Sequence, residues 1–78
     1  MPQNGPIILR IAVPSPLRRT FDYKLPESLR LKVKNHKPLP GMRVTVEFGR
    51  RLMVGLIVDI PETSEVASDK LKDISEII

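Results

Sequence analysis

The sequence predicts a mainly β fold, a small single-domain β-barrel of five to six short strands with little helix. Two observations support this prediction. Apolar and polar residues alternate in several short stretches, and a period of two is typical of strands. Eight prolines and four glycines also divide the 78 residues into gaps that are mostly too short for a full helix. Closure into a barrel would remove the edges that so small a sheet otherwise exposes.

The first two predicted strands lie in the N-terminal third of the chain. Residues 1–6 (MPQNGP) are polar and rich in helix and strand breakers, so we expect a flexible segment ahead of a domain that spans 7–78. Residues 7–13 (IILRIAV) are largely apolar on both faces, which favours a buried strand that ends at Pro14. Residues 20–25 (TFDYKL) place aromatic residues on one face and polar residues on the other, as in a half-buried strand.

Two more strands are predicted in the middle of the chain. Residues 29–34 (LRLKVK) alternate strictly, which favours a strand over a helical turn. A loop with two prolines and a glycine follows at 35–41 (NHKPLPG). Residues 42–48 (MRVTVEF) alternate again, with the apolar side chains on the face that we expect to point inward.

The C-terminal part begins with a predicted hairpin turn at 49–51 (GRR). Residues 52–60 (LMVGLIVDI) form the most apolar run and predict a core strand that bends or bulges at Gly55. We expect a last strand at 72–78, and a short helix capped by Ser68 is the alternative.

Several classes of protein are excluded or disfavoured by composition. Without cysteine, the chain has neither a disulfide nor a cysteine-based zinc site. No apolar run approaches the roughly 18 residues of a membrane helix, and the N-terminus makes a poor signal peptide, so we expect a cytoplasmic protein with no membrane partner. The one histidine, His36, falls in a predicted loop, and no catalytic motif or metal-ligand cluster accompanies it. We therefore expect neither an enzyme nor a cofactor.

Charge is distributed unevenly along the chain. Residues 1–51 hold eleven Lys or Arg and three acidic residues, whereas residues 52–78 hold two and six. Such a split suggests a polyanionic partner for part of the surface. Basic residues in predicted loops, among them Arg19, Arg50 and Arg51, are candidates for contacts with nucleic-acid phosphates. A generic RNA- or DNA-binding barrel, a protein-interaction barrel with an acidic partner and an ordinary solvated surface all remain open on this evidence.

Asp22 is an unusual residue for a phosphate-binding surface, because it lies between Phe21 and Tyr23 in the basic half of the chain. The alternating pattern alone favours a strand with the aromatic residues inward and the Asp22 carboxylate outward. A second interpretation is that the carboxylate accepts a hydrogen bond from a terminal 3′-OH. A continuing strand would carry a phosphate at that position, and the carboxylate would repel it.

Four sequence motifs carry a resemblance to a known family. They are VPxPLxRTFDYxLP at residues 13–26, GMRVxVxFGR at 41–50, GLIV at 55–58 and LKxI at 71–74. Together these motifs resemble the N-terminal domain of the PriA replication-restart helicases over nearly all of residues 9–78. The first two motifs are specific as a pair, whereas either alone is weak.

The resemblance implies both a function and a set of partners. Members of the family recognise stalled replication forks, unwind DNA with ATP and reload the replicative helicase. Their N-terminal module resembles a compact β-rich domain that captures the 3′-OH end of the nascent leading strand. The 78 residues contain no helicase motif, so we expect a DNA-binding module without ATPase activity. Its expected partners are DNA with a free 3′-OH end at branched forks, the remainder of a helicase chain and other primosome proteins.

The resemblance also implies a pocket for the 3′-terminal nucleotide, lined by Phe21, Asp22, Tyr23, Gly49 and Lys72. In this pocket the Asp22 carboxylate would accept the 3′-OH, and the two aromatic rings would flank the last base or sugar. The backbone at the glycine would approach the nucleotide closely. The lysine ammonium would meet a base edge or a phosphate.

The chain departs from the family pattern in two places. The basic, proline-rich stretch around residues 30–39 is longer than the usual connection, and it either extends the DNA path or forms a solvated flap. Its basic residues are Arg30, Lys32, Lys34 and Lys37. Glu47 also replaces the proline that usually precedes the Phe-Gly pair, which adds an acid beside Gly49.

Overall fold

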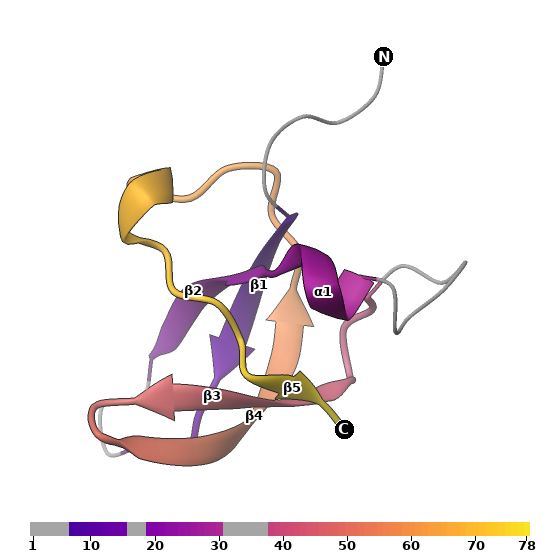
Figure 1. The fold of residues 1–78 in the computed structure, drawn as a ribbon, viewed down its shortest axis with the longest axis vertical. Coiled ribbons are helices and arrows are strands. Elements are labelled where there is room, and N and C mark those ends of the chain that lie inside the picture. The colour runs from indigo at the N-terminus through magenta and orange to yellow at the C-terminus, as the bar shows by residue number, and fades with distance from the viewer. Residues whose placement is uncertain (1–6, 16–18, 31–37) are drawn as a thin grey trace.

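The computed structural model describes residues 7–15, 19–30 and 38–78. Its main feature is a five-stranded antiparallel sheet with the order β2-β1-β4-β3-β5 (Figure 1). The strands are β1 (Ile7–Ala12), β2 (Thr20–Leu25), β3 (Arg43–Phe48), β4 (Arg51–Asp59) and β5 (Glu76–Ile77). The described helices are the single-turn α1 (Glu27–Arg30) and the 3-10 helix η1 (Ser68–Lys70), and neither is long and apolar enough to cross a membrane.

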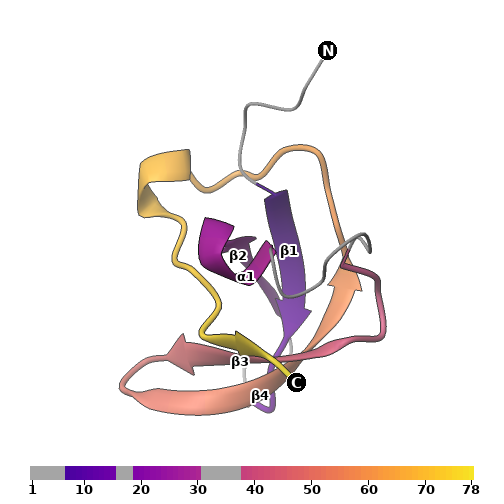
Figure 2. The same cartoon turned by 45° about the vertical axis from the view of Figure 1, so that its right-hand side comes forward.

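The predicted mainly β fold with little helix is confirmed, but the sheet does not close, so a barrel describes it only approximately. The sheet bends strongly, and β1 and β2 rise steeply from the β3–β4 hairpin (Figure 2). The segment before β5 then reaches back to β2. The Lys24 amide donates to the Lys72 carbonyl at 2.9 Å, and the Ile74 amide donates to the Lys24 carbonyl at 3.0 Å. This segment therefore contacts β2 before β5 pairs with β3.

The core fills the inner face of the bent sheet. The alternation of apolar and polar residues explains which side chains two of the strands contribute to the core. Strand β2 buries Tyr23 and Leu25, and strand β3 buries Val44 and Val46. The predicted inward faces are thus confirmed at these four residues, whereas Phe21 and Phe48 on the same faces are only partly buried. Burial of these side chains removes apolar surface from water, which is the main stabilising contribution in a domain this small. The buried cluster consists of Leu9, Ile11, Tyr23, Leu25, Leu29, Val44, Val46, Ile57 and Ile74.

The strand predicted at residues 29–34 is wrong where the structure describes it. Leu29 and Arg30 form the end of α1, and their amides both donate to the Pro26 carbonyl, at 3.0 and 3.2 Å. One helical turn is enough to bury Leu29 in the core, and an ion pair from Arg30 to Glu27 at 3.1 Å spans the turn. Alternation over so few residues does not distinguish a strand from a helical turn. The rest of the predicted strand, 31–34, and residues 1–6 lie outside the described residues.

The strand predicted at residues 52–60 exists as β4, but it is a core strand on one face only. Gly55 and Ile57 are buried, whereas the opposite face is exposed. The exposed side chains are those of Leu52, Val54, Leu56 and Val58. The pairing with β3 runs unbroken through Gly55, and the irregularity lies instead beside β1, where Arg10 pairs with Asp59 but the next residue pairs with Ile57. The predicted bulge is therefore absent from the β3 pairing at Gly55, and the irregularity lies in the pairing of β4 with Arg10 and Ile11 of β1.

Gly55 has a different structural role, which is to allow close approach of β1. A Cβ atom at this position would collide with the Ile11 side chain and lie 3.1 Å from the Ala12 carbonyl oxygen. Near the C-terminus, the strand predicted at 72–78 is confined to the two residues of β5. The alternative helix corresponds to η1, which begins at Ser68. The predicted cap at Ser68 is wrong, because the N-cap position is Ala67 and no side-chain hydrogen bond caps the helix.

Candidate nucleic-acid interface

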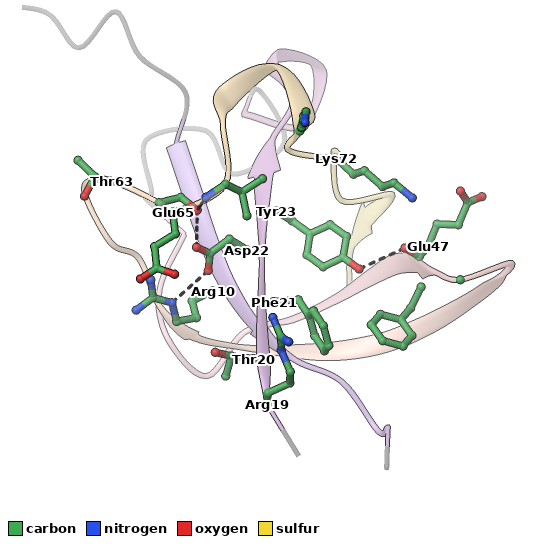
Figure 3. Close-up of a pocket in the computed structure, with 15 residues that line it drawn as sticks. Arg10, Arg19, Thr20, Phe21, Asp22, Tyr23, Glu47, Thr63, Glu65 and Lys72 are labelled. Atoms are coloured by element: carbon green, nitrogen blue, oxygen red, sulfur yellow. Dashed lines mark hydrogen bonds and ion pairs between the residues drawn. The ribbon is translucent and has the colours of Figure 1, made fainter. Parts of the chain in front are cut away.

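A hollow in the surface brings together the end of β1, strand β2, the β3–β4 turn and the C-terminal segments (Figure 3). Its volume of about 840 Å³ is within the range of pockets that hold small ligands. Six of the eight predicted site residues line it: Arg19, Phe21, Asp22, Tyr23, Gly49 and Lys72. The other two do not line it, because Arg50 lies in the exposed turn and Arg51 is the exposed first residue of β4.

Asp22 lies at the centre of a polar network in the hollow. Its side chain is only 11% exposed, and Arg10 Nε donates to Oδ1 at 3.0 Å. The Ser64 hydroxyl donates to the other oxygen, Oδ2, at 2.5 Å. Arg10 Nη1 also lies 3.8 Å from an Asp59 carboxylate oxygen. Asp22 lies on the face of β2 opposite the buried Tyr23 and Leu25, as the alternation predicts, and partners on β1 and on a distant loop hold it in place.

The environment of Asp22 keeps its carboxylate ionised. Burial alone would raise the pKa of Asp22, but the hydrogen bonds from Arg10 and Ser64 and the charge of Arg10 together lower the pKa below its ordinary value. The same hydrogen bond and charge pairing raise the pKa of Arg10. At neutral pH the carboxylate is therefore an acceptor-only group whose two oxygens offer about four lone-pair positions.

Phe21 forms the apolar wall of the hollow. Its ring meets the ring of Phe48 edge to face, with centroids 4.7 Å apart and an interplanar angle of 65°. The Arg19 guanidinium lies 4.9 Å from the centroid of the Phe21 ring, within the range of a cation–π contact. The ring therefore holds a cation at the hollow even though Arg19 is exposed.

Tyr23 closes the hollow from the side of the core. The residue is 5% exposed, and its hydroxyl donates to the Glu47 carbonyl oxygen at 3.2 Å. Burial, with a smaller contribution from the Glu47 charge, raises the pKa of Tyr23, so the phenol stays protonated and continues to donate. The bond joins β2 to the end of β3, next to the turn that contains Gly49.

The backbone conformation at position 49 favours glycine. It is the first residue of a two-residue turn between paired Phe48 and Arg51, and its φ of 67° lies in the left-handed region. A Cβ atom there would meet nothing within 4 Å, so free space remains beside this backbone. The predicted hairpin is confirmed, and its tip borders the hollow.

The charges in the hollow are mixed. The basic residues are Arg10, Arg19, Lys70 and Lys72, and the acidic residues are Asp22, Glu47 and Glu65. In Figure 3, Asp22 lies with Arg10 and Glu65 on one side, and Lys72 lies with Tyr23 and Glu47 on the other. The C-terminal half of the chain, acidic on balance, thus supplies two of the four cations. Among the described residues no group of three or more His, Cys, Asp or Glu side chains is suited to hold a metal ion.

Sequence reasoning missed Arg10 and Ser64. The antiparallel pairing of β1 and β2 places Arg10 directly opposite Asp22, so pairing the two predicted strands in this register would have identified Arg10 as the partner. Ser64 lies in an irregular loop 42 positions away, and nothing in the local sequence signals its contact. In the basic stretch around residues 30–39, Arg30 pairs with Glu27. The remaining basic residues and the histidine lie outside the described residues: Lys32, Lys34, His36 and Lys37.

Comparisons with known proteins identify related chains. Residues 10–78 match the family described as "3'DNA-binding domain (3'BD)" of PriA. Replication restart protein PriA of Haemophilus influenzae is 42% identical over 67 residues, which cover 86% of this chain and 8% of that protein. Replication restart protein PriA of Bacillus subtilis is 33% identical over 60 residues, which cover 77% of this chain and 7% of that protein. The chain thus spans less than a tenth of the length of these relatives.

Proposed function

Because the chain belongs to the PriA 3′ DNA-binding domain family, we propose that it captures the 3′-OH end of a nascent leading strand at a stalled fork. The family is a DNA-binding domain of a replication restart protein, and such a domain is not itself catalytic. In this proposal the domain directs a helicase chain, to which it is joined, and the primosome proteins that follow, to forks with an available end. The observation that carries the proposal is the ionised, partly buried Asp22 carboxylate in a hollow lined by rings and cations.

The carboxylate explains selectivity for an end. A 3′-OH donates a hydrogen bond to Asp22, and a bond to a charged acceptor is stronger than one between neutral groups. A 3′-phosphate, whether terminal or part of a continuing strand, brings negative charge against the carboxylate. Because Asp22 is only 11% exposed, water screens that repulsion poorly. Selectivity in the proposal therefore comes from one acid.

The other lining residues position the nucleotide. Phe21 offers an apolar ring edge to a base or sugar, and Arg19, held on that ring, is available to a phosphate one step back along the strand. Free space at Gly49 lets the backbone approach. Lys72 lies on the far side of the hollow, where its exposed ammonium meets a base edge or a phosphate. None of these contacts depends on a particular base, so recognition is sequence-tolerant.

The proposal is tested with oligonucleotides of one sequence that end in 3′-OH, 3′-phosphate or 3′-dideoxy, by fluorescence anisotropy. The wild-type domain is expected to prefer the 3′-OH end by about tenfold. Asp22→Asn is expected to reduce that preference to near unity, by weakening the 3′-OH complex and strengthening the 3′-phosphate complex. Asp69→Asn is the matched control, because it removes the same charge from an exposed residue outside the hollow.

Two other outcomes correspond to other functions. Equal binding of all three ends, with a steep loss of affinity in salt, would indicate a generic nucleic-acid binder that uses its basic surface alone. Absence of DNA binding at low salt would indicate a protein-interaction domain. Either outcome refutes capture of a 3′ end.

A further inference from the structure

The Ser64 hydroxyl occupies part of the proposed binding site. Ser64 lies in the segment between β4 and η1, and its hydroxyl donates to Asp22 Oδ2 at 2.5 Å. Ser64 Oγ also accepts a hydrogen bond from the Val66 amide at 3.1 Å, so the hydroxyl proton is committed to the carboxylate. In Figure 3 the segment, marked by Thr63 and Glu65, lies beside Asp22. One acceptor position on Asp22 Oδ2 is thus already filled by a hydroxyl of this chain.

A serine side chain and a 3′-OH are the same kind of donor. Both are neutral alcohols that offer one proton to a carboxylate. Resting on the proposed 3′-OH capture, we propose that Ser64 holds the acceptor position on Asp22 in the DNA-free domain and that the 3′-OH displaces it. Only an end that donates a hydrogen bond replaces the bond that is lost. An end without a donor leaves Ser64 in place, so Ser64 competes with the 3′-OH end alone. Ser64 is therefore a specificity-determining residue, because this competition sets how strongly the 3′-OH end is preferred.

Arg10 keeps the other half of the site in place during this exchange. Its Nε bonds Oδ1, the oxygen that Ser64 does not use, and its position in β1 opposite Asp22 is fixed by the strand pairing. The carboxylate therefore keeps a charged partner and stays ionised after Ser64 has left. Arg10 acts as a positioning residue for Asp22, and in this proposal one carboxylate oxygen keeps its partner while the other exchanges its partner.

Displacement of Ser64 has a second consequence through its neighbour. Glu65 also lines the hollow, close enough for its charge to affect Arg10. A carboxylate there opposes a DNA phosphate while the segment is in place, and it moves when Ser64 moves. Among the described residues, the bond to Asp22 is the one side-chain hydrogen bond that joins residues 61–66 to the sheet. The exchange therefore breaks this hydrogen bond between the segment and the sheet.

The test compares the wild-type domain with Ser64→Ala, using the 3′-OH and 3′-dideoxy oligonucleotides. Removal of the competing hydroxyl is expected to tighten binding of the 3′-OH end at least about threefold, with binding of the 3′-dideoxy end unchanged. Thr63→Ala, the matched control, also lies in the hollow but makes no hydrogen bond to Asp22. It is expected to leave both affinities unchanged. In an Asp22→Asn background the Ser64 substitution is expected to have no effect.

Solution NMR supplies a direct readout of the displacement. The Val66 amide signal is expected to shift when the 3′-OH oligonucleotide binds and to stay in place with the 3′-dideoxy one, because this amide donates to the Ser64 hydroxyl. Weaker or unchanged 3′-OH binding by Ser64→Ala, or equal tightening for both ends, overturns the exchange. If the wild-type domain still prefers the 3′-OH end and Asp22→Asn abolishes that preference, end capture stands without the exchange. If the wild-type domain shows no preference for the 3′-OH end, both proposals are overturned.

Discussion

The hydrogen bond from Tyr23 to the Glu47 carbonyl offers a sharp test of how the hollow is held together. It joins β2 to β3, which are separated in the sheet by β1 and β4. Tyr23→Phe removes the hydroxyl and keeps the ring, so the core volume hardly changes. At 3.2 Å and partly buried, the bond is an ordinary neutral one, and we expect its loss to lower the free energy of unfolding by about 1 kcal/mol.

The assay is urea denaturation together with thermal melting. For a domain of this size, about 1 kcal/mol corresponds to a decrease in Tm of about 4–8 °C. We also expect weaker binding of 3′-OH DNA, by about twofold, because the bond positions the turn that contains Gly49. An unchanged free energy of unfolding would refute the bond. A less stable variant with unchanged DNA affinity would refute its role in positioning the turn.

The same phenol can be observed directly, because Tyr23 is the one tyrosine and the chain has no tryptophan. Its pKa is raised, mainly by burial, so the folded state binds the phenolic proton more tightly than the unfolded state. That contribution to stability is fully present below the ordinary tyrosine pKa of about 10 and is lost as pH rises through the raised value. Ultraviolet titration is expected to show tyrosinate forming only above that ordinary value. Titration at the ordinary value in the folded domain would contradict the burial argument.

Two further predictions concern stability. Gly55→Ala forces a Cβ atom against Ile11, and we expect a loss of about 1–3 kcal/mol in urea denaturation, whereas Val54→Ala on the exposed face of the same strand should cost less than about 0.5 kcal/mol. Equal costs would contradict the close approach of β1. The lowered pKa of Asp22 gives stability that is present above the ordinary carboxyl value of about 3.9 and is lost as pH falls through the lowered value. Asp22→Asn should therefore flatten the acid side of a Tm-against-pH curve, and an unaltered slope would contradict this.

The parts of the fold that sequence predicts well are those where the two faces of a strand differ in polarity. In β3, Val44 and Val46 alternate with polar residues, so the pattern identifies both the strand and its buried face. In β4 both faces are apolar, and the pattern therefore cannot tell that Leu52 and its neighbours are exposed. The strand predicted from Leu29 onward is wrong for another reason. A single buried side chain is compatible with a helical turn as well as with a strand, and the Pro26 carbonyl accepts the hydrogen bonds of the turn.

The candidate site divides in the same way between local and distant contributions. Phe21, Asp22 and Tyr23 are adjacent in sequence, and one motif contains them. Lys72 comes to the hollow because its carbonyl pairs with the Lys24 amide, and this pairing of distant segments leaves no mark in the local pattern. The loop contact from Ser64 is equally invisible in the sequence. Sequence therefore identified the carboxylate but gave no indication of its hydrogen bond from Ser64.

The arrangement of charge separates affinity from selectivity. Four cations and three acids nearly cancel inside the hollow, so the hollow itself attracts a polyanion weakly. Arg50 and Arg51 lie outside it, exposed at the hairpin end that borders Gly49, where solvent and salt screen them. Asp22, only 11% exposed and fixed by Arg10, is screened far less. Salt should therefore weaken the overall attraction for DNA while the distinction between a 3′-OH and a 3′-phosphate persists. The excess of basic residues in the first 51 positions of the sequence is thus not reproduced in the hollow, where basic and acidic side chains nearly balance.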